Sequence, residues 1–362
     1  MFDIAIIGAG INGCACAYEL TKKGKRVALF DKDGVASGGS GAAGAFISPK
    51  FSKSGELKEL LHCAFVYSMD YYEKEFPHIL QKSKLLHIAK DEADDEILRV
   101  YKEHTDLELF DTPKNERESL VIKAGLVNAK ALCNAMAKSA QSIKEEVTSL
   151  EYDNGVWIIN ETYTAKEIIL ATGAYKQIIQ EPYIQLRGIW GHRIDVETTT
   201  KNPHSIHQYV SISPSENGAL AIGATHNVHY HPQTSTGAYN VQEGREELLE
   251  KASRSIKLEN VKVVKDYTGL RSGSFDYLPL VGSLVLSHET LKNKNIHFQT
   301  KKPNYWEYTY YPQLTMINGS GGYGFVLAPY LAKILTENIH TSKEIPKGLL
   351  PARFFARWAK KI

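Results

Sequence analysis

A short apolar run near the start of the chain is followed at once by a turn that is rich in glycine. Residues 4–7 are all apolar, and residues 8–13 have the pattern G-x-G-x-x-G. The spacing of apolar positions then predicts a helix over residues 14–22 and a second strand over residues 26–30, with Asp31 at its end. A strand, a glycine turn, a helix, a strand and an acidic residue in this order are typical of a dinucleotide-binding unit.

The residues of this turn each have a physical role. Gly8 allows the tight turn, Gly10 leaves room for a pyrophosphate, and Gly13 lets the helix lie close to the strand. The unpaired N–H groups at the start of the helix attract phosphates, and the Asp31 carboxylate can accept hydrogen bonds from a ribose. We expect contacts with the dinucleotide from Gly8, Gly10, Ile11, Gly13, Asp31 and Lys32.

Small residues dominate the next segment of the chain. Eleven of the twelve residues from 34 to 45 are glycine, alanine or serine. Small side chains let the backbone approach a large flat ligand, and the backbone N–H groups can then bind its phosphates. This favours FAD over NAD, although a flexible linker has a similar composition. We expect contacts with the cofactor from Ser40, Gly41, Ala43 and Gly44.

The apolar pattern of the rest of the chain indicates two domains. An apolar strand at residues 167–170 ends in A-T-G, and ligands collect at the carboxyl ends of such buried strands. From residue 184 to about 280 apolar and polar residues alternate, which predicts an antiparallel sheet. A strand at residues 314–318 then leads through a second glycine turn at 319–324 into a helix.

We therefore predict an α/β protein in which a Rossmann-like FAD-binding domain carries an inserted substrate domain of the α+β type, built on an antiparallel sheet. The FAD-binding domain is expected to comprise residues 1–75, 119–183 and 310–362. The substrate domain is expected to comprise residues 76–118 and 184–309.

Composition and charge are those of an ordinary globular protein. The chain has 362 residues, 43% of them hydrophobic, and a formal net charge of +2, so a nucleic-acid partner would need a local basic patch. The four cysteines show no C-x-x-C spacing, which indicates neither a metal nor a disulfide and suggests buried thiols in a cytoplasmic protein. No apolar segment is long enough to cross a membrane or to act as a signal peptide.

The chain resembles the D-amino-acid oxidase and glycine oxidase superfamily of FAD enzymes, and within it the oxidoreductases that modify the wobble uridine of tRNA. The resemblance runs nearly end to end. It rests on the first glycine turn with Asp31, the segment S-G-G-S-G-A-A-G-A, the A-T-G at 171–173, L-R-G at 186–188, I-G-A at 222–224, G-L-R at 269–271, L-P-L-V-G at 278–282, the second glycine turn before Ala328-Pro329, and Pro351-x-Arg353.

The resemblance implies the roles of several residues. Arg271 of G-L-R would bind the substrate carboxylate, for which a planar guanidinium is suited. The pattern H-x-Y at 207–209 would place the Tyr209 hydroxyl near the same carboxylate; His207 could equally be a core or surface histidine. FAD would be bound without a covalent link, and further contacts with it are expected from Val147, Ala171, Thr172, Gly173, Gly319, Gly321, Gly322, Tyr323 and Gly324.

The reaction implied is the FAD-dependent oxidative removal of a carboxymethyl group, as glyoxylate, from a secondary amine. The substrate implied is 5-carboxymethylaminomethyl-(2-thio)uridine at the tRNA wobble position, and a separate methyltransferase could then complete the modification. An oxidase or dehydrogenase of free glycine, sarcosine or D-amino acids is the first alternative, and a flavin-bearing tRNA-binding protein without turnover is the second.

The end of the chain is the predicted contact with tRNA. Residues 347–362 contain five basic residues and no acidic ones, with Phe354, Phe355 and Trp358 among them. Basic residues interleaved with aromatic ones suit phosphates and bases. A solvated terminal helix would show the same run of charge.

Overall fold

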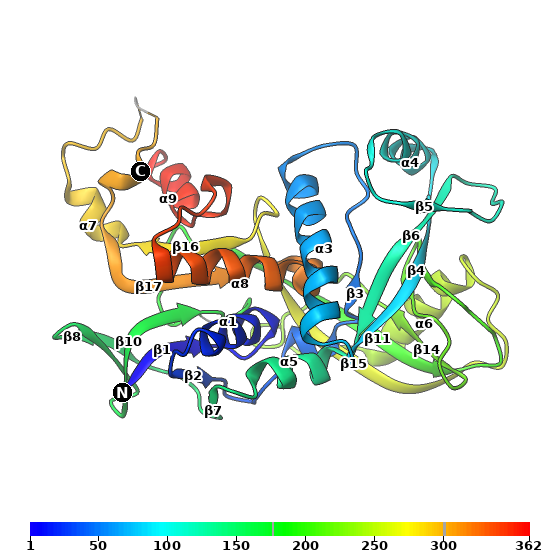
Figure 1. Cartoon of the computed structure of the whole chain (residues 1–362), viewed down its shortest axis with the longest axis horizontal. Coiled ribbons are helices and arrows are strands. Elements are labelled where there is room, and N and C mark those ends of the chain that lie inside the picture. Colours follow the sequence, from blue (N-terminus) through cyan, green and yellow to red (C-terminus); the bar gives the residue numbers. More distant parts are fainter. Residues whose placement is uncertain (176, 300–301) are drawn as a thin grey trace.

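Two β-sheets lie side by side in the molecule, with helices packed against both (Figure 1). The computed structural model describes residues 1–175, 177–299 and 302–362. The first sheet has the strand order β16-β17-β10-β1-β2-β7. Its strands are β1 (Phe2–Ile7), β2 (Val27–Phe30), β7 (Gln141–Ile143), β10 (Tyr163–Leu170), β16 (Leu280–Val285) and β17 (Tyr310–Asn318), and β10 also pairs with a hairpin of β8 (Leu150–Asp153) and β9 (Val156–Ile159).

The centre of the first sheet is parallel, so its strands end at one edge. β1 pairs in parallel with both β2 and β10, and β10 pairs in parallel with β17. Because both faces of these strands are buried, Ile4 and Ile6 pack on one side and Ala5 and Ile7 on the other. The predicted fold class, a Rossmann-like α/β domain joined to a second sheet, is confirmed.

Helices cover one face of the first sheet, and smaller elements cover the other. The first face packs against α1 (Ile11–Lys22), α5 (Ala129–Ala137) and α8 (Gly324–Thr341), with α3 (Glu56–Glu75) behind them. The second face packs against the end of the chain, where α9 (Ala352–Ala359) buries Phe354 and Phe355. The sheet is therefore the middle layer of three.

The second sheet is mostly antiparallel and has the order β15-β11-β14-β13-β12-β4-β6-β3. Only the pair β4 and β12 runs parallel among its described strands. The strands are β3 (Phe46–Ile47), β4 (Leu80–Ile88), β5 (Leu109–Phe110), β6 (Ser119–Val127), β11 (Leu186–Glu197), β12 (Ser205–His207), β13 (Ser211–Ile212), β14 (Ala219–Gly223) and β15 (Lys262–Ser274).

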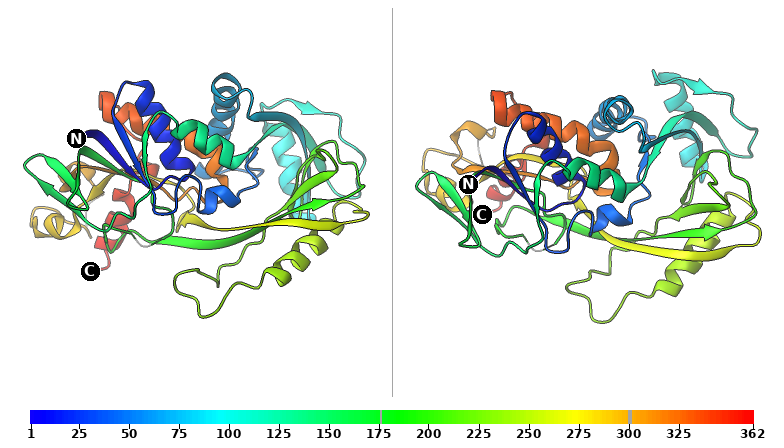
Figure 2. Two further views of the ribbon diagram at one scale, coloured as in Figure 1. Left: turned by 90° about the horizontal axis from the view of Figure 1, so that it is seen from below. Right: turned by 60° about the horizontal axis from the view of Figure 1, so that its bottom comes forward.

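Alternation along these strands gives the second sheet two different faces. One face carries Ile194, Ile212 and Ile222 and packs against α6 (Val241–Ser253). The loop between β14 and α6 lies on that same side of the long strands β11 and β15 (Figure 2). The other face looks toward the first sheet and, as shown below, contributes to the cavity. At the far end, α4 (Glu92–His104) packs on β4 and β6.

The division of the chain between the sheets differs from the predicted one at three strands. β3 and β6 fall within the predicted FAD-binding segments but belong to the second sheet, and β16 shows the reverse. The reason for β6 is that it pairs with β4 over nine residues, although α4 and β5 separate the two strands along the chain. Such a pairing is tertiary and leaves no local signal. The rest of the predicted division stays a prediction.

The helices of the described residues include none that is both long enough and apolar enough to cross a membrane.

Candidate active site

A cavity lies where the carboxyl ends of β1, β10 and β17 meet the start of α1. Gly8 turns the chain there with φ of +106°, and a Cβ atom on it would lie 2.3 Å from the carbonyl oxygen of Ala171. Gly13 is equally constrained, because its Cβ would lie 1.9 Å from the carbonyl oxygen of Gly8. The turn, the helix and β10 are therefore packed backbone to backbone, as the glycine spacing predicts.

The first turn of α1 presents its backbone N–H groups to this cavity. Gly10 caps the helix without a side-chain hydrogen bond, and both Gly10 and Ile11 line the cavity. The Ile11 N–H donates to the Ser40 hydroxyl oxygen, 2.9 Å away, which brings the segment of small residues onto the helix start. A helix N-terminus of this kind binds phosphate through its dipole and its N–H groups.

Asp31 joins the first glycine turn to the segment that follows it. Its carboxylate accepts hydrogen bonds from the backbone N–H groups of Ala9 at 2.9 Å and Gly34 at 3.1 Å, and from the Ser37 hydroxyl at 3.1 Å. The carboxylate lines the cavity and can accept further hydrogen bonds on its remaining lone pairs. The carboxylate can therefore bind the expected ribose while it also holds the surrounding loop in place.

A polar network holds the second glycine turn against the first. The Asn12 side-chain amide donates to the Ser320 hydroxyl at 3.0 Å. Asn318, at the end of β17, donates to the Gly173 carbonyl at 3.0 Å and accepts from the Ser272 hydroxyl at 2.8 Å. The ends of α1, β10, β15 and β17 are thus tied together around one cavity, and Gly321 and Gly322 leave open space beside it.

Most of the residues expected to contact the cofactor line this cavity. They are Gly8, Gly10, Ile11, Asp31, Lys32, Ser40, Ala43, Gly44, Val147, Ala171, Thr172, Gly173, Gly321, Gly322 and Gly324. Gly13, Gly41, Gly319 and Tyr323 do not line it. The three glycines permit close backbone packing or a turn. The Tyr323 ring centroid lies 5.8 Å from the Lys50 ammonium group, and the partial burial of this residue raises its pKa.

Arg271 lies in the same cavity, on the face of the second sheet that looks toward the first. Its guanidinium fits against Gly191 on the neighbouring strand, where a Cβ atom would lie 2.7 Å from Nη2. The Arg271 Nη1 donates to the Thr225 carbonyl oxygen at 3.1 Å. Burial lowers the pKa of Arg271, and among the described residues no carboxylate forms an ion pair with it. Its remaining donors suit a ligand carboxylate.

The structure places Tyr209 away from Arg271, which corrects the expectation that both hold one carboxylate. β12 ends at His207, so Tyr209 falls in the turn to β13. Its hydroxyl donates to the Lys90 carbonyl at 3.3 Å, and its ring lies 5.3 Å from the Arg254 guanidinium. The three-residue pattern that suggested the pairing carries no information about where the strand ends.

His207 does not line the cavity: the residue is half-buried, and its ring Nε2 is inaccessible to solvent. Its ring packs edge-on against Phe46 with centroids 5.1 Å apart, and Phe46 in turn lies close to Gly44, which does line the cavity. Burial lowers the pKa of His207 to about 4, so the ring is neutral at pH 7. The open alternative of a core histidine therefore fits its surroundings.

Several cavity residues were not predicted from the sequence. Asn12, Asn318 and Ser320 lie within or beside the two glycine turns, so attention to the polar residues there could have found them. Gly191 and Gln233 carry no such signal, because the pairing of β11 with β15 and the loop before α6 bring them to the site.

The residues present fit FAD. Two glycine turns, a helix N-terminus and the Asp31 carboxylate line one cavity, and Arg271 lines it too. None of the four cysteines lines the cavity. The part of the chain that the structure describes contains no group of three or more His, Cys, Asp or Glu that could hold a metal ion.

Comparison with known sequences agrees with this geometry. The model of the family described as "FAD dependent oxidoreductase" matches residues 3–338. The bifunctional protein MnmC of Legionella pneumophila (strain Lens), named for tRNA 5-methylaminomethyl-2-thiouridine biosynthesis, is 25% identical over 97% of this chain and 57% of its own length. The chain thus spans little more than half of that relative. Glycine oxidase of Bacillus licheniformis is 25% identical over 78% of this chain and 84% of its own length.

Solved structures share the fold. Glycine oxidase from Geobacillus kaustophilus superposes with a TM-score of 0.73 at 20% sequence identity and covers 95% of both chains. Iminodiacetate oxidase from Chelativorans sp. BNC1 superposes with a TM-score of 0.71 at 17% identity, over 96% of this chain and 98% of that one. At these identities the likeness concerns the fold.

Proposed function

This chain belongs to the FAD dependent oxidoreductase family, and from that premise we propose that it oxidatively removes a carboxymethyl group from a secondary amine and releases glyoxylate. Because the chain belongs to this family, its cofactor is FAD and it is an amine-oxidising enzyme. The observation that supports the proposed substrate is Arg271, a half-buried residue whose guanidinium lines the cofactor cavity and forms no ion pair with the described carboxylates.

A buried charge is costly unless a partner stabilises it. The Arg271 guanidinium donates one hydrogen bond, to the Thr225 carbonyl oxygen, and it packs against Gly191, which has no side chain. A substrate of the form R–NH–CH2–COO⁻ would complete the pair through two parallel hydrogen bonds. The carboxylate is then fixed, and the methylene beside it is held at the cavity wall formed by the two glycine turns.

The chemistry of this proposal is balanced. FAD, when bound, would supply the two-electron oxidant, and the methylene carbon loses a hydride to it. The amine loses its proton as the C=N bond forms, and water then adds to that carbon so that the C–N bond breaks. The products are the primary amine, R–NH2, and glyoxylate. The protein supplies binding and orientation, and no nucleophile of the chain is required.

We propose 5-carboxymethylaminomethyluridine in tRNA, with or without the 2-thio group, as the source of this amine. Support comes from similarity to MnmC over 97% of the chain, whereas the glycine oxidase similarity covers 78%. An exposed lining residue also supports a large substrate, because Gln233 lines the cavity and is open to solvent. On this proposal a separate methyltransferase could complete the modification.

Oxidation of free glycine, sarcosine or a D-amino acid is the second candidate. It is favoured by coverage of the relatives, since the chain spans 84% of the glycine oxidase but only 57% of MnmC. Arg271 would serve a free amino acid equally well. The position of Arg271 inside the cavity does not favour a flavin-bearing tRNA-binding protein without turnover.

Mass spectrometry of wobble nucleosides tests the proposal in the cell. A strain that lacks this gene should accumulate the carboxymethylaminomethyl nucleoside, and the wild-type gene should restore its conversion. A gene carrying Arg271→Lys should restore little of it. Nucleosides that are unchanged by the deletion would move the assignment to the free amino-acid reaction.

A further inference from the structure

The basic tail is less available to a nucleic acid than its sequence predicts. Arg353 is buried and donates to both oxygens of the Asp276 carboxylate at 2.9 and 3.0 Å, and to the Leu278 carbonyl at 2.7 Å. Arg357 is exposed but also donates to Asp276, at 3.1 Å. These arginines hold the turn between β15 and β16, so the turn itself becomes the feature to explain.

That turn exposes two aromatic rings. Phe275 is 51% exposed and Tyr277 is 66% exposed, while Asp276 between them points to the arginines of α9. Tyr277 also has φ of +66°, a left-handed conformation that is unfavourable for a bulky side chain. Large exposed rings on a strained turn have a cost in stability, and such strain is found where a function retains it.

Arg187 holds both rings in place. Its guanidinium carbon lies 5.0 Å from the Phe275 ring centroid and 4.8 Å from that of Tyr277. Its Nη2 donates to the carbonyl oxygens of Ser274 and Phe275, each at 3.1 Å. We call Arg187, Phe275 and Tyr277 the aromatic platform. With Arg353 and Arg357 against the single carboxylate of Asp276, the group has an excess of positive charge.

The platform lies next to the cavity on the same side of the second sheet. Arg187 of β11 pairs with Gly273 of β15, and Ile189, two residues further along β11, pairs with Arg271. Since odd-numbered residues of both strands point to one face, Arg187 shares the face of Arg271. Phe275 follows Ser272, which lines the cavity, by three residues.

We propose that the aromatic platform binds unpaired bases of an RNA loop while one nucleotide of that loop enters the cavity. This rests on the proposed function, because it takes RNA as the substrate. Aromatic rings and a guanidinium offer flat faces on which any base can stack. The surrounding positive charge suits the phosphates between those bases.

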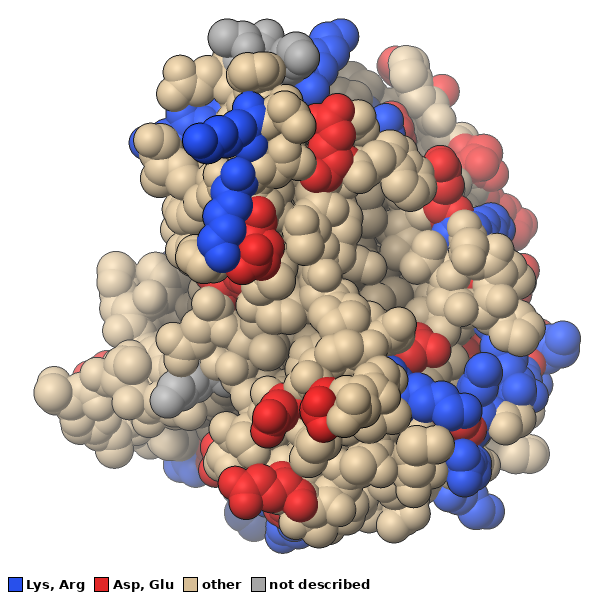
Figure 3. Space-filling model, turned by 90° about the vertical axis from the view of Figure 1, so that its left-hand side faces the viewer, with Lys and Arg blue, Asp and Glu red and all other residues tan. Residues whose placement is uncertain are grey.

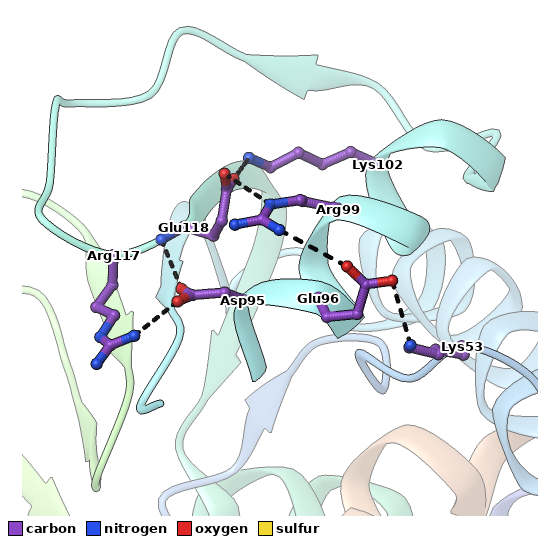
Figure 4. A network of polar contacts seen from close by, with 7 residues as sticks. All are labelled: Lys53, Asp95, Glu96, Arg99, Lys102, Arg117 and Glu118. Carbon is purple, nitrogen blue, oxygen red and sulfur yellow. Dashed lines mark hydrogen bonds and ion pairs between the residues drawn. The ribbon is translucent and has the colours of Figure 1, made fainter. Parts of the chain in front are cut away.

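Two other surfaces fit RNA less well. The ion-pair network at the far end of the second sheet matches its cations to acids: Lys53 and Arg99 contact Glu96, Arg99 and Lys102 contact Glu118, and Arg117 contacts Asp95 (Figure 4). The face of the molecule in Figure 3 carries Lys and Arg in separate groups, with Asp and Glu near them and a broad uncharged area between. A continuous basic field is absent from that face, as far as its described residues show.

The test compares loop binding with duplex binding for the FAD-loaded protein. The probes are an RNA hairpin with an unpaired loop and a fully paired RNA duplex of equal length, followed by fluorescence anisotropy. A variant with Phe275→Leu and Tyr277→Leu keeps apolar bulk but loses the flat rings. It should bind the hairpin more weakly by on the order of tenfold for each ring, with duplex binding unchanged.

The matched control exchanges the rings without removing them. Phe275→Tyr with Tyr277→Phe should bind the hairpin like the wild type. Equal hairpin binding by the leucine variant, or a parallel loss of hairpin and duplex binding, would overturn the platform. So would a wild type that dimerises through these rings and a leucine variant that is monomeric with unchanged RNA binding.

Turnover of a free carboxymethylamine separates this proposal from the proposed function. If wild type and leucine variant bind and oxidise the modified RNA equally, the platform is wrong and the proposed function stands. If the wild type oxidises the free amine but binds neither RNA, the tRNA substrate and the platform both fall.

Discussion

Arg271 is the residue on which the proposed chemistry depends most. Arg271→Lys keeps the charge but loses the bidentate hydrogen-bonding geometry. For a carboxylate substrate, kcat/KM should therefore fall by an amount that corresponds to a loss of about 1.5–3 kcal/mol in transition-state stabilisation. Steady-state kinetics with an N-carboxymethylamine would measure this, with flavin content as the check on folding. A variant with full flavin and unchanged kinetics would remove Arg271 from the substrate site.

Gly191 tests the same contact from the opposite side. In Gly191→Ala the new Cβ would lie 2.7 Å from Arg271 Nη2, so the flexible guanidinium must move while the backbone stays in place. The expected result is a kcat/KM lower by roughly 10- to 100-fold with a nearly unchanged Tm.

Gly273→Ala is the matched control for this substitution. It lies on the same pair of strands, but its Cβ would meet its nearest atom at 3.7 Å, an ordinary contact. Its kinetics should equal those of the wild type. If the two alanine variants behave alike, the fit of Arg271 against Gly191 has no part in catalysis.

At the scale of single residues, the sequence predicted which residues line the cavity where their positions are set by neighbouring residues. Gly8, Gly10 and Asp31 belong to one continuous strand-turn-helix unit, and the structure places them at the cavity. Tyr209 failed because its position depends on where a three-residue strand ends. Gly191 could not be predicted because its partner Arg271 is eighty residues away along the chain. The two residues become neighbours only when β11 pairs with β15.

Among the elements, α9 is held to the turn between β15 and β16 by one buried ion pair. Burial alone would raise the pKa of Asp276, but the hydrogen bonds and charge of Arg353, with help from Arg357, hold it below its ordinary value. Arg353→Met would leave this half-buried carboxylate without its main partner. The free energy of unfolding should fall by about 3–5 kcal/mol, as measured by urea denaturation.

Arg357→Met provides the comparison, because it removes a cation from the same carboxylate at an exposed position. Its effect should stay within about 1 kcal/mol. Equal effects of the two methionine variants would show that burial does not decide the strength of these ion pairs.

The strand pair β4 and β12 predicts a dependence of stability on pH. His87 and His207 are opposite each other in the pairing, and burial lowers their pKa values to about 3 and about 4, with a smaller contribution of His207 and Lys90 at His87. Below about pH 6.5 the unfolded chain binds protons that the native state excludes. The free energy of unfolding should therefore fall with decreasing pH, by up to ~1.4 kcal/mol per pH unit for each histidine, down to about pH 4.

Urea unfolding between pH 7 and pH 4 measures this slope. Replacing both residues, as His87→Gln with His207→Gln, should remove their contribution and so reduce the slope by up to ~1.4 kcal/mol per pH unit for each histidine. An unaltered slope in the double variant would mean that these two rings are protonated in the folded protein.

At the scale of elements, the sequence predicted helices well and sheet membership less well. The helix predicted over residues 14–22 forms as α1, which begins three residues earlier, at Ile11, and ends at Lys22. β6 lies in a segment predicted to belong to the FAD-binding domain but pairs in the second sheet, because its partner β4 is separated from it along the chain by a helix and a strand. The terminal helix was expected to present its cations to solvent, but Arg353 is used to fix the turn that carries the aromatic platform.

In the molecule as a whole, both sheets contribute to the cavity. The first sheet positions the two glycine turns, and the second sheet positions Arg271. The glycine turns made the first half of this arrangement predictable. The second half follows from the pairing of β11 with β15 and the docking of that pair on the small residues of α2 (Gly39–Ala42), where a Cβ on Gly39 would lie 2.4 Å from the Leu270 carbonyl oxygen. Such a contact between segments far apart along the chain has no signature in either one.

The central claim is that this cavity oxidises the carboxymethyl group of a secondary amine carried by RNA. The most direct measurement mixes the FAD-loaded protein, without oxygen, with an RNA hairpin that bears 5-carboxymethylaminomethyluridine in its loop. The flavin absorbance should bleach, with one glyoxylate released for each flavin reduced, and an unmodified hairpin should leave the flavin oxidised. Bleaching by glycine or sarcosine but not by the modified hairpin would contradict the claim.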